Sequence, residues 1–196
     1  MTNFLKGTLA TAGLFAFALP AMADTVTISD TLDGSEPTFD HPVSGATTLT
    51  SYDTISFTVD ADGMYDFLSF YPGDTDADEN MDGVLLIYDG FDPLDPSTGL
   101  LASDDDYSAG DVAGLGAFDG ACVGSNCSGF SAMLTAGTTY TLVQTSFTDV
   151  ANTFGQPTGS YDLTLTGAGN ITVVPVPAAV WLMMSGLAGL GFMRRK

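Results

Sequence analysis

An all-β fold, an antiparallel β-sandwich of the jelly-roll kind, is the fold class that the central part of this sequence predicts. Between Asp24 and Ile171, apolar and polar residues alternate in several short runs, which is typical of half-buried strands. Gly, Asp and Pro separate these runs, and no window carries the apolar stripe of a helix. The region holds about 150 residues, enough for one domain with its own core.

Three strands are expected in the first half of this region. The first alternates Val26 and Ile28 with Thr and Ser, and residues 31–45, rich in Gly and Pro, are expected to be irregular. The second strand ends at Val59, and Asp62-Gly63 is expected to turn it into the third as a hairpin. The third strand places Asp66, Leu68 and Phe70 on one face and four larger or polar side chains on the other: Tyr65, Phe67, Ser69 and Tyr71.

Three further strands are expected in the second half. Val84 to Tyr88 is a compact apolar run, which favours a central strand with both faces covered. Residues 138–147 and 160–165 each carry Tyr and Leu at every second position. Short strands at this spacing, with aromatic residues at alternate positions, favour two packed antiparallel sheets.

The N-terminal residues have the three parts of a secretory signal peptide. Lys6 precedes an apolar run from Leu9 to Leu19, and Ala21-Met22-Ala23 then forms an Ala-x-Ala cleavage site before Asp24. The apolar run is too short to span a bilayer. We therefore expect residues 1–23 to be removed by signal peptidase during Sec-dependent export, which leaves an ectodomain of residues 24–172.

The C-terminal residues 173–196 also have three parts. A proline-broken lead-in is followed by an uncharged apolar run from Ala178 to Met193 and by a basic end. As a helix this run would be roughly 24 Å long, enough to span the membrane if Trp181 and the basic end reach the interfaces. The cations stay on the cytoplasmic side, so the ectodomain is expected to face the periplasm. A plain C-terminal anchor helix is the alternative.

These C-terminal residues resemble the PEP-CTERM sorting signal of Gram-negative bacteria, in its variant with a Val-Pro-Leu-Pro-Ala box. Here the box reads Val-Pro-Val-Pro-Ala-Ala, with Val176 in the place of the usual Leu and no Glu between the prolines. The resemblance implies cleavage near the box by an exosortase, a membrane protease-transpeptidase, after a transient stay in the inner membrane, and then release or transfer to the cell surface. The residues that carry it are Val174, Pro175, Val176, Pro177, Ala178, Ala179, Trp181, Arg194, Arg195 and Lys196.

A second resemblance concerns the ectodomain. Six segments in order are similar to the β-sandwich ectodomains that precede PEP-CTERM tails and to the bacterial pre-peptidase C-terminal domain, an accessory module of secreted proteases. The family pattern often has Arg where this chain has His41. The resemblance implies a binding or structural module without a named activity. Its segments are 37–42, 55–59, 63–66, 85–93, 101–105 and 134–140.

Charge is distributed very unevenly along the chain. All four Lys and Arg residues lie in the two targeting segments, whereas all 24 Asp and Glu residues lie between Asp24 and Asp162. Nucleic acid and anionic surfaces are therefore excluded as expected partners. Since no Lys or Arg can pair with them, the acids must be solvated, screened by salt or neutralised by bound cations.

Two acidic stretches are the candidate metal ligands. Residues 73–83 place oxygen ligands at alternate positions, and a run of three aspartates follows Ser103. Ca²⁺ takes six to eight oxygen ligands, so it is the cofactor that these stretches predict; a solvated acidic loop is the alternative. The frame from Asp78 matches an EF-hand loop in part, but the following run is expected to be a strand. The predicted ligands are Asp74, Asp76, Asp78, Asn80, Asp82, Asp104, Asp105 and Asp106.

The two cysteines, Cys122 and Cys127, are expected to form a disulfide. An exported chain lies in an oxidising compartment, and neither His nor a further Cys is close in sequence, which disfavours a metal or redox role. The bond would close a very short loop and stabilise the fold by roughly 2 kcal/mol at most.

Enzymatic functions are disfavoured, because His41 is the only histidine and no nucleophile motif accompanies it. The sequence predicts an exported, non-catalytic structural or adhesive protein of the cell surface or extracellular matrix, with exopolysaccharide as its candidate target. The alternative is a Ca²⁺-dependent carbohydrate-binding module with Tyr107 and Phe118 as exposed aromatic residues. A secreted hydrolase is the third hypothesis, and it requires a polar cluster at His41 or a carboxylate pair across a cleft.

Overall fold

The computed structural model describes residues 23–43, 49–72, 81–106, 127–150 and 155–174. In these ranges the chain forms strands and no helix, and so no described helix is long and apolar enough to cross a membrane. The strands are β1 (Asp24–Leu32), β2 (Thr38–Phe39), β3 (Thr50–Val59), β4 (Gly63–Phe70), β5 (Gly83–Tyr88), β6 (Leu100–Asp104), β7 (Cys127–Leu134), β8 (Thr139–Ser146), β9 (Gly159–Gly167) and β10 (Ile171–Val174).

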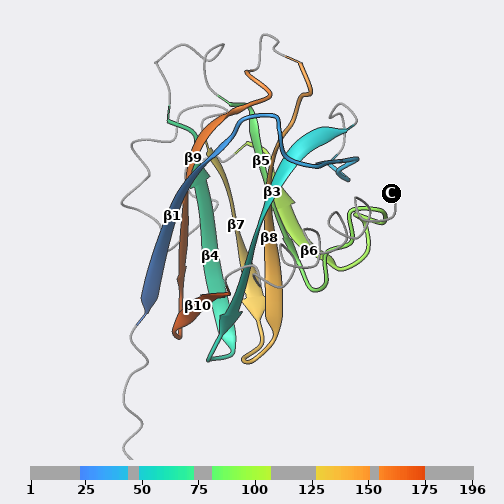
Figure 1. Ribbon diagram of the computed structural model, residues 1–196. Coiled ribbons are helices and arrows are strands. Elements are labelled where there is room, and N and C mark those ends of the chain that lie inside the picture. The colour runs from blue at the N-terminus through green and yellow to red at the C-terminus, as the bar shows by residue number, and fades with distance from the viewer. Residues whose placement is uncertain (1–22, 44–48, 73–80, 107–126, 151–154, 175–196) are drawn as a thin grey trace, which may run out of the picture.

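The strands form two antiparallel sheets that pack against each other (Figure 1). The four-stranded sheet has the order β1-β9-β4-β7, and the six-stranded sheet has the order β10-β3-β8-β5-β6, with β2 also paired to β3. All pairings between strands are antiparallel. The prediction of an all-β antiparallel fold is confirmed, and the arrangement is consistent with a β-sandwich.

The main core lies between the two sheets. Phe57 of β3 and Phe67 of β4 meet across the interface with ring centroids 5.9 Å apart. Tyr65, Phe67 and Tyr71, which were expected to share one face, are all fully buried. Burial of this many aromatic side chains is the main stabilising contribution to such a fold.

A second apolar cluster covers the outer face of the six-stranded sheet. Val84, Leu86 and Tyr88 of β5 belong to it, whereas Leu85 and Ile87 belong to the main core. All six residues of β5 are therefore buried, which confirms the prediction of a central strand with both faces covered.

The predicted hairpin at Asp62-Gly63 is wrong. Strand β3 pairs with β8 and β10, whereas β4 pairs with β7 and β9, so the chain crosses from one sheet to the other at this turn. The physical reason is that both strands carry large apolar side chains on one face, and these faces are buried against each other. Asp62 has a different role: its Oδ1 accepts a hydrogen bond from the N–H of Ala136, 2.7 Å away.

Four strands were not expected from the sequence. Strand β2 lies inside the stretch expected to be irregular, and β6, β7 and β10 were not predicted as strands at all. Strand β10 runs to Val174, two residues beyond the expected end of the ectodomain at residue 172. Residues 1–22 of the expected signal peptide and all residues after Val174 lie outside the described ranges.

Candidate functional site

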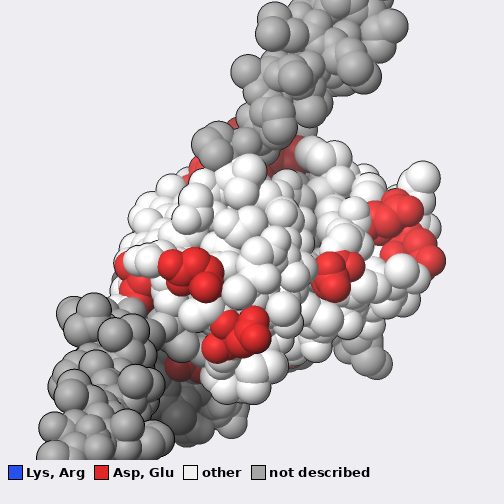
Figure 2. Space-filling view, turned by 90° about the horizontal axis from the view of Figure 1, so that it is seen from below, with Lys and Arg blue, Asp and Glu red and all other residues white. Residues whose placement is uncertain are grey.

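Several carboxylates of the described residues accept hydrogen bonds from uncharged donors, and these ranges contain no Lys or Arg. Figure 2 shows the acids of one end of the molecule as separate patches among uncharged side chains. Ser131 donates to Asp66 at 2.6 Å, and the Tyr161 hydroxyl donates to Asp53 at 2.8 Å. Hydrogen bonds to uncharged donors do not weaken with salt as surface ion pairs do.

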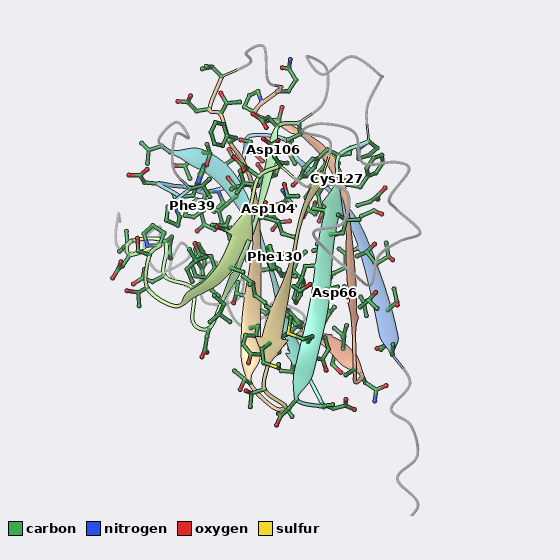
Figure 3. The ribbon with its side chains drawn as sticks, turned by 180° about the vertical axis from the view of Figure 1, so that it is seen from behind. Phe39, Asp66, Asp104, Asp106, Cys127 and Phe130 are labelled. Carbon is green, nitrogen blue, oxygen red and sulfur yellow. The ribbon has the colours of Figure 1, made fainter. Side chains whose placement is uncertain are left out.

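Four aspartates at one end of the β5–β6 pair form what we call the acidic corner: Asp82, Asp104, Asp105 and Asp106. Asp82 directly precedes β5, and Asp104 is the last residue of β6, where it lies opposite Leu85. Because the two strands are antiparallel, the start of β5 and the end of β6 lie side by side at the same end of the sheet. Figure 3 shows Asp104 and Asp106 at this end of the sheet, near Cys127.

A buried network of polar side chains lies next to the acidic corner. The Tyr71 hydroxyl donates to the Ser128 hydroxyl at 2.9 Å and accepts from the side-chain amide of Gln144 at 3.2 Å. Gln144 also accepts from Ser69 at 2.6 Å. Burial raises the pKa of Tyr71 to about 12, so its hydroxyl keeps its proton.

The same network joins the edges of the two sheets. The Ser128 hydroxyl bonds to the carbonyl of Gly83 at 2.6 Å and to the carbonyl of Asp105 at 3.0 Å. The N–H of Gly129 donates to Asp104 Oδ2 at 2.8 Å. Strand β7 therefore fixes the backbone of Asp105 and the side chain of Asp104.

Gly83 makes room for this network. A Cβ atom at this position would lie 2.0 Å from the ring of Tyr71, far inside van der Waals contact. Only glycine lets the backbone come this close to the aromatic ring. The absence of a side chain at Gly83 therefore lets the Tyr71 ring pack against the start of β5. Tyr71 in turn connects the acidic corner to the core.

Asp82 is the exceptional member of the acidic corner. Its N–H donates to the carbonyl of Gln156 at 3.1 Å, and its own carbonyl accepts from Phe147 at 2.7 Å, so its backbone is held on both sides. The residue is only 4% exposed. Burial, and then the charges of Asp106 and Asp105, raise the pKa of Asp82 to about 6.

The predicted calcium ligands are only partly brought together. Asp82, Asp104, Asp105 and Asp106 lie at the acidic corner, while Asp74, Asp76, Asp78 and Asn80 lie outside the described residues. Within the described part of the chain, no group of three or more His, Cys, Asp or Glu side chains is gathered closely enough to hold a metal ion. The residues after the acidic stretch form strand β5, which agrees with discounting an EF-hand.

His41 lies in a place that the sequence did not reveal. It is 5% exposed, its ring lies 5.8 Å from that of Phe39, and neither ring nitrogen has a hydrogen-bond partner among the described residues. Burial lowers the pKa of His41, although the backbone of Ser146 and the charges of Asp40 and Asp105 act in the opposite direction. Both ring nitrogens of His41 are thus buried.

Only a few residues of the other predicted sites lie within the described ranges. Cys127 is buried and disulfide-bonded, and Cys122 lies outside the described residues. Asp24 begins β1, and its carboxylate accepts hydrogen bonds from the N–H groups of Thr25 at 2.9 Å and Ile171 at 3.0 Å. Ala23 is exposed, and the other predicted cleavage and sorting residues, apart from Val174, lie outside the described ranges, as do Tyr107 and Phe118.

Comparison with known proteins identifies no relative of this chain. No family model matches the chain, and no curated protein matches its sequence significantly. A proposal about function must therefore be argued from the residues and contacts of this molecule alone.

Proposed function

We propose that this protein is an exported, exosortase-sorted component of the cell surface or extracellular matrix, and that its β-sandwich is a non-catalytic structural or adhesive module. One observation supports this most directly. Strand β1 begins at Asp24, the residue that follows the expected signal-peptide cleavage site, and β10 ends at Val174, the first residue of the sorting box. The strands thus occupy the interval between the two expected cleavage sites.

The surface chemistry also supports the proposal. The described ranges hold no Lys or Arg, so no ion pair with these residues forms within them. Surface carboxylates there accept hydrogen bonds from Ser, Thr, Tyr, Asn and backbone groups. Such a surface stays hydrated and soluble when salt varies outside the cell. The buried position of His41 further supports a non-catalytic role over a hydrolase.

The experiment that tests the proposal compares two hosts. The full chain is produced in a Gram-negative strain that has an exosortase and in the same strain without it, followed by fractionation. We expect surface or secreted protein in the first host and an inner-membrane form in the second. A matched variant, Pro175→Ala with Pro177→Ala, should accumulate in the membrane of both hosts. Cytoplasmic protein that keeps residues 1–23 in both hosts would contradict the proposal.

A second candidate function, Ca²⁺-dependent carbohydrate binding, is favoured by the state of Asp82. A carboxylate on a residue that is only 4% exposed, close to two further carboxylates, is costly to ionise unless a cation neutralises it. Asp82, Asp105 and Asp106 would contribute oxygens, and bound Ca²⁺ would supply the missing positive charge. No three such side chains among the described residues are gathered closely enough to hold the ion, so this candidate requires oxygen ligands from elsewhere in the chain.

Thermal unfolding tests the calcium candidate. The melting temperature of the processed protein should rise by several degrees in millimolar Ca²⁺ relative to chelator at matched ionic strength. Binding to acidic and neutral exopolysaccharides is then measured in both conditions. Identical melting curves would remove the calcium candidate, while polysaccharide binding that ignores Ca²⁺ would favour the adhesive module without a metal.

A further inference from the structure

We propose that strand β1 is a sheet edge able to pair with the β1 strand of a second copy of this chain, and that the carboxylates of Asp24 and Asp30 prevent this pairing. The inference goes beyond the function proposed above and depends on neither export nor sorting. Its basis is a contact that is made twice. The N–H of Thr25 donates to Asp24 Oδ1 at 2.9 Å, and the N–H of Thr31 donates to Asp30 Oδ1 at 2.8 Å.

Strand β1 is a long and regular edge strand. It stands first in the order β1-β9-β4-β7 and forms one flank of the sandwich (Figure 1). All of its residues pair with β9 in an uninterrupted register, and none of them is Pro, Gly or Lys. Proline, lysine and β-bulges are common devices that stop an edge strand from pairing with another chain. The only charged residues of β1 are Asp24 and Asp30, which makes them the candidates for this task.

The two carboxylates occupy N–H groups on the open side of β1. In an antiparallel pair of strands, the N–H groups of alternate residues point toward the partner strand and away from it. Thr25 and Thr31 donate to aspartate side chains, so they belong to the set that points away from β9, together with Thr27 and Ser29. All four residues are exposed. A further strand added at this edge would need the same N–H groups that the carboxylates occupy.

The occupied positions match a two-fold pairing of β1 with itself. Two antiparallel copies centred on Ile28 would bring Thr25 opposite Thr31 of the second copy, and Thr27 opposite Ser29 of the second copy. The outward-pointing residues would thus face one another across a two-fold axis, as in a symmetric dimer with an isologous interface. Thr25 and Thr31 form the outer pairs of this ladder, so the two carboxylates obstruct it at both ends.

The same contact recurs at other open edges of the two sheets. Thr54 lies in the stretch of β3 between its pairings with β2 and β10, and its N–H donates to Asp53 Oδ1 at 2.7 Å. Strand β7 is the last strand of the four-stranded sheet, and there the N–H of Gly129 donates to Asp104 Oδ2 at 2.8 Å. The described ranges contain neither Lys nor Arg, so aspartate takes at these edges the role that lysine has in many β-proteins.

Disulfide trapping in the full chain tests the inference. Chains with Thr27→Cys and chains with Ser29→Cys are purified separately in mild detergent, mixed and oxidised, and the 27–29 cross-link is identified by peptide mass. Opposite residues of such a ladder have Cα atoms about 5.5 Å apart, within reach of a disulfide. In the background of Asp24→Ala with Asp30→Ala, we expect roughly tenfold more cross-linked dimer than in the natural background, because the outer pairs of the ladder become available.

The matched control is Asp24→Asn with Asp30→Asn. These substitutions remove the same two charges, but the amide oxygen still accepts a hydrogen bond from the following N–H. We therefore expect cross-linking at the natural level. If the Asn background cross-links as strongly as the Ala background, charge repulsion rather than occupation of the N–H groups keeps the chains apart, and the inference is overturned. An Ala background that retains its fold and cross-links no more than the natural chain overturns it too.

Two further variants keep the test decisive. Asp24 also accepts from the N–H of Ile171 at 3.0 Å, so Asp30→Ala alone is used if the double Ala variant loses its melting transition, and it should raise cross-linking by roughly threefold. Thr27→Cys chains oxidised without Ser29→Cys chains should cross-link poorly, because residues 27 of two copies are not opposite each other in the register centred on Ile28. Cross-linking as strong as in the mixture would contradict the proposed pairing.

Discussion

Replacing Asp82 by Asn should stabilise the protein when Ca²⁺ is absent, which is the opposite of what most substitutions at buried positions do. The carboxylate of Asp82 is buried beside Asp105 and Asp106, and its pKa rises from an ordinary 3.8 to about 6. Each unit of pKa difference corresponds to about 1.4 kcal/mol, so ionising Asp82 in the folded protein costs up to roughly 3 kcal/mol. Asn has almost the same shape and removes this cost.

The sign of the pH dependence follows from the direction of the pKa change. Because the folded protein holds this proton more tightly than the unfolded chain, the stability that Asp82 contributes is complete below about pH 4 and is lost as pH rises through 6. The advantage of Asp82→Asn should therefore be near zero at pH 4 and reach its full value at pH 7.5. For a domain of this size the full value corresponds to roughly 5–10 °C in melting temperature.

The assay is thermal unfolding at both pH values, with chelator and with millimolar Ca²⁺. Asp89→Asn is the matched control, because Asp89 is exposed and follows the same strand. In chelator at pH 7.5, Asp82→Asn should melt above both the natural protein and the control. In Ca²⁺ the natural protein should gain stability that the variant cannot. If Asp82→Asn and Asp89→Asn melt alike in chelator at pH 7.5, the account of the acidic corner is refuted.

Three further predictions concern the buried polar groups. Tyr71→Phe should lower the free energy of unfolding, measured by urea denaturation, by about 1–3 kcal/mol, because Ser128 loses its hydrogen-bond donor. Tyr88→Phe should be neutral or stabilising, because the buried Tyr88 hydroxyl has no partner among the described residues. Equal losses in the two variants would refute the network. Gly83→Ala should cost about 3 kcal/mol or more, since its Cβ would meet the Tyr71 ring, and a variant with unchanged urea midpoint would contradict this. His41→Leu should flatten the loss of stability between pH 7.5 and 5, because burial lowers the pKa of His41 and the folded protein therefore resists protonation as the pH falls; a parallel pH profile would be evidence against it.

The sequence predicted the strands whose inward and outward residues differ clearly. Alternation at Phe57, at Tyr65 and Phe67, and along β8 and β9 was sufficient to predict strands there, and the structure places these side chains in the core. Strand β7 escaped prediction because it places Ser128 and Ala132 inward, where they fit only against partners such as Tyr71. Alternation also identifies a face but not a neighbour, which is why the turn after β3 was taken for a hairpin.

The acidic residues of the candidate site were predicted from the sequence, but their burial and contacts were not. The acidic run at residues 104–106 is evident in the sequence, whereas the burial of Asp82 depends on contacts with Phe147 and Gln156, more than sixty residues away. His41 was expected in an irregular stretch, and its ring lies against Phe39, which belongs to the second apolar cluster with residues of strand β5. Such long-range contacts have no signal in local sequence patterns.

The central claim is that this β-sandwich is delivered outside the cell by processing at both of its ends. Intact-mass spectrometry of the protein recovered from the surface or medium of an exosortase-containing host tests it most directly. We expect a chain that begins at Asp24 and ends within or just after the box at residues 174–179. A recovered chain that retains both Met1 and Lys196 would contradict the claim.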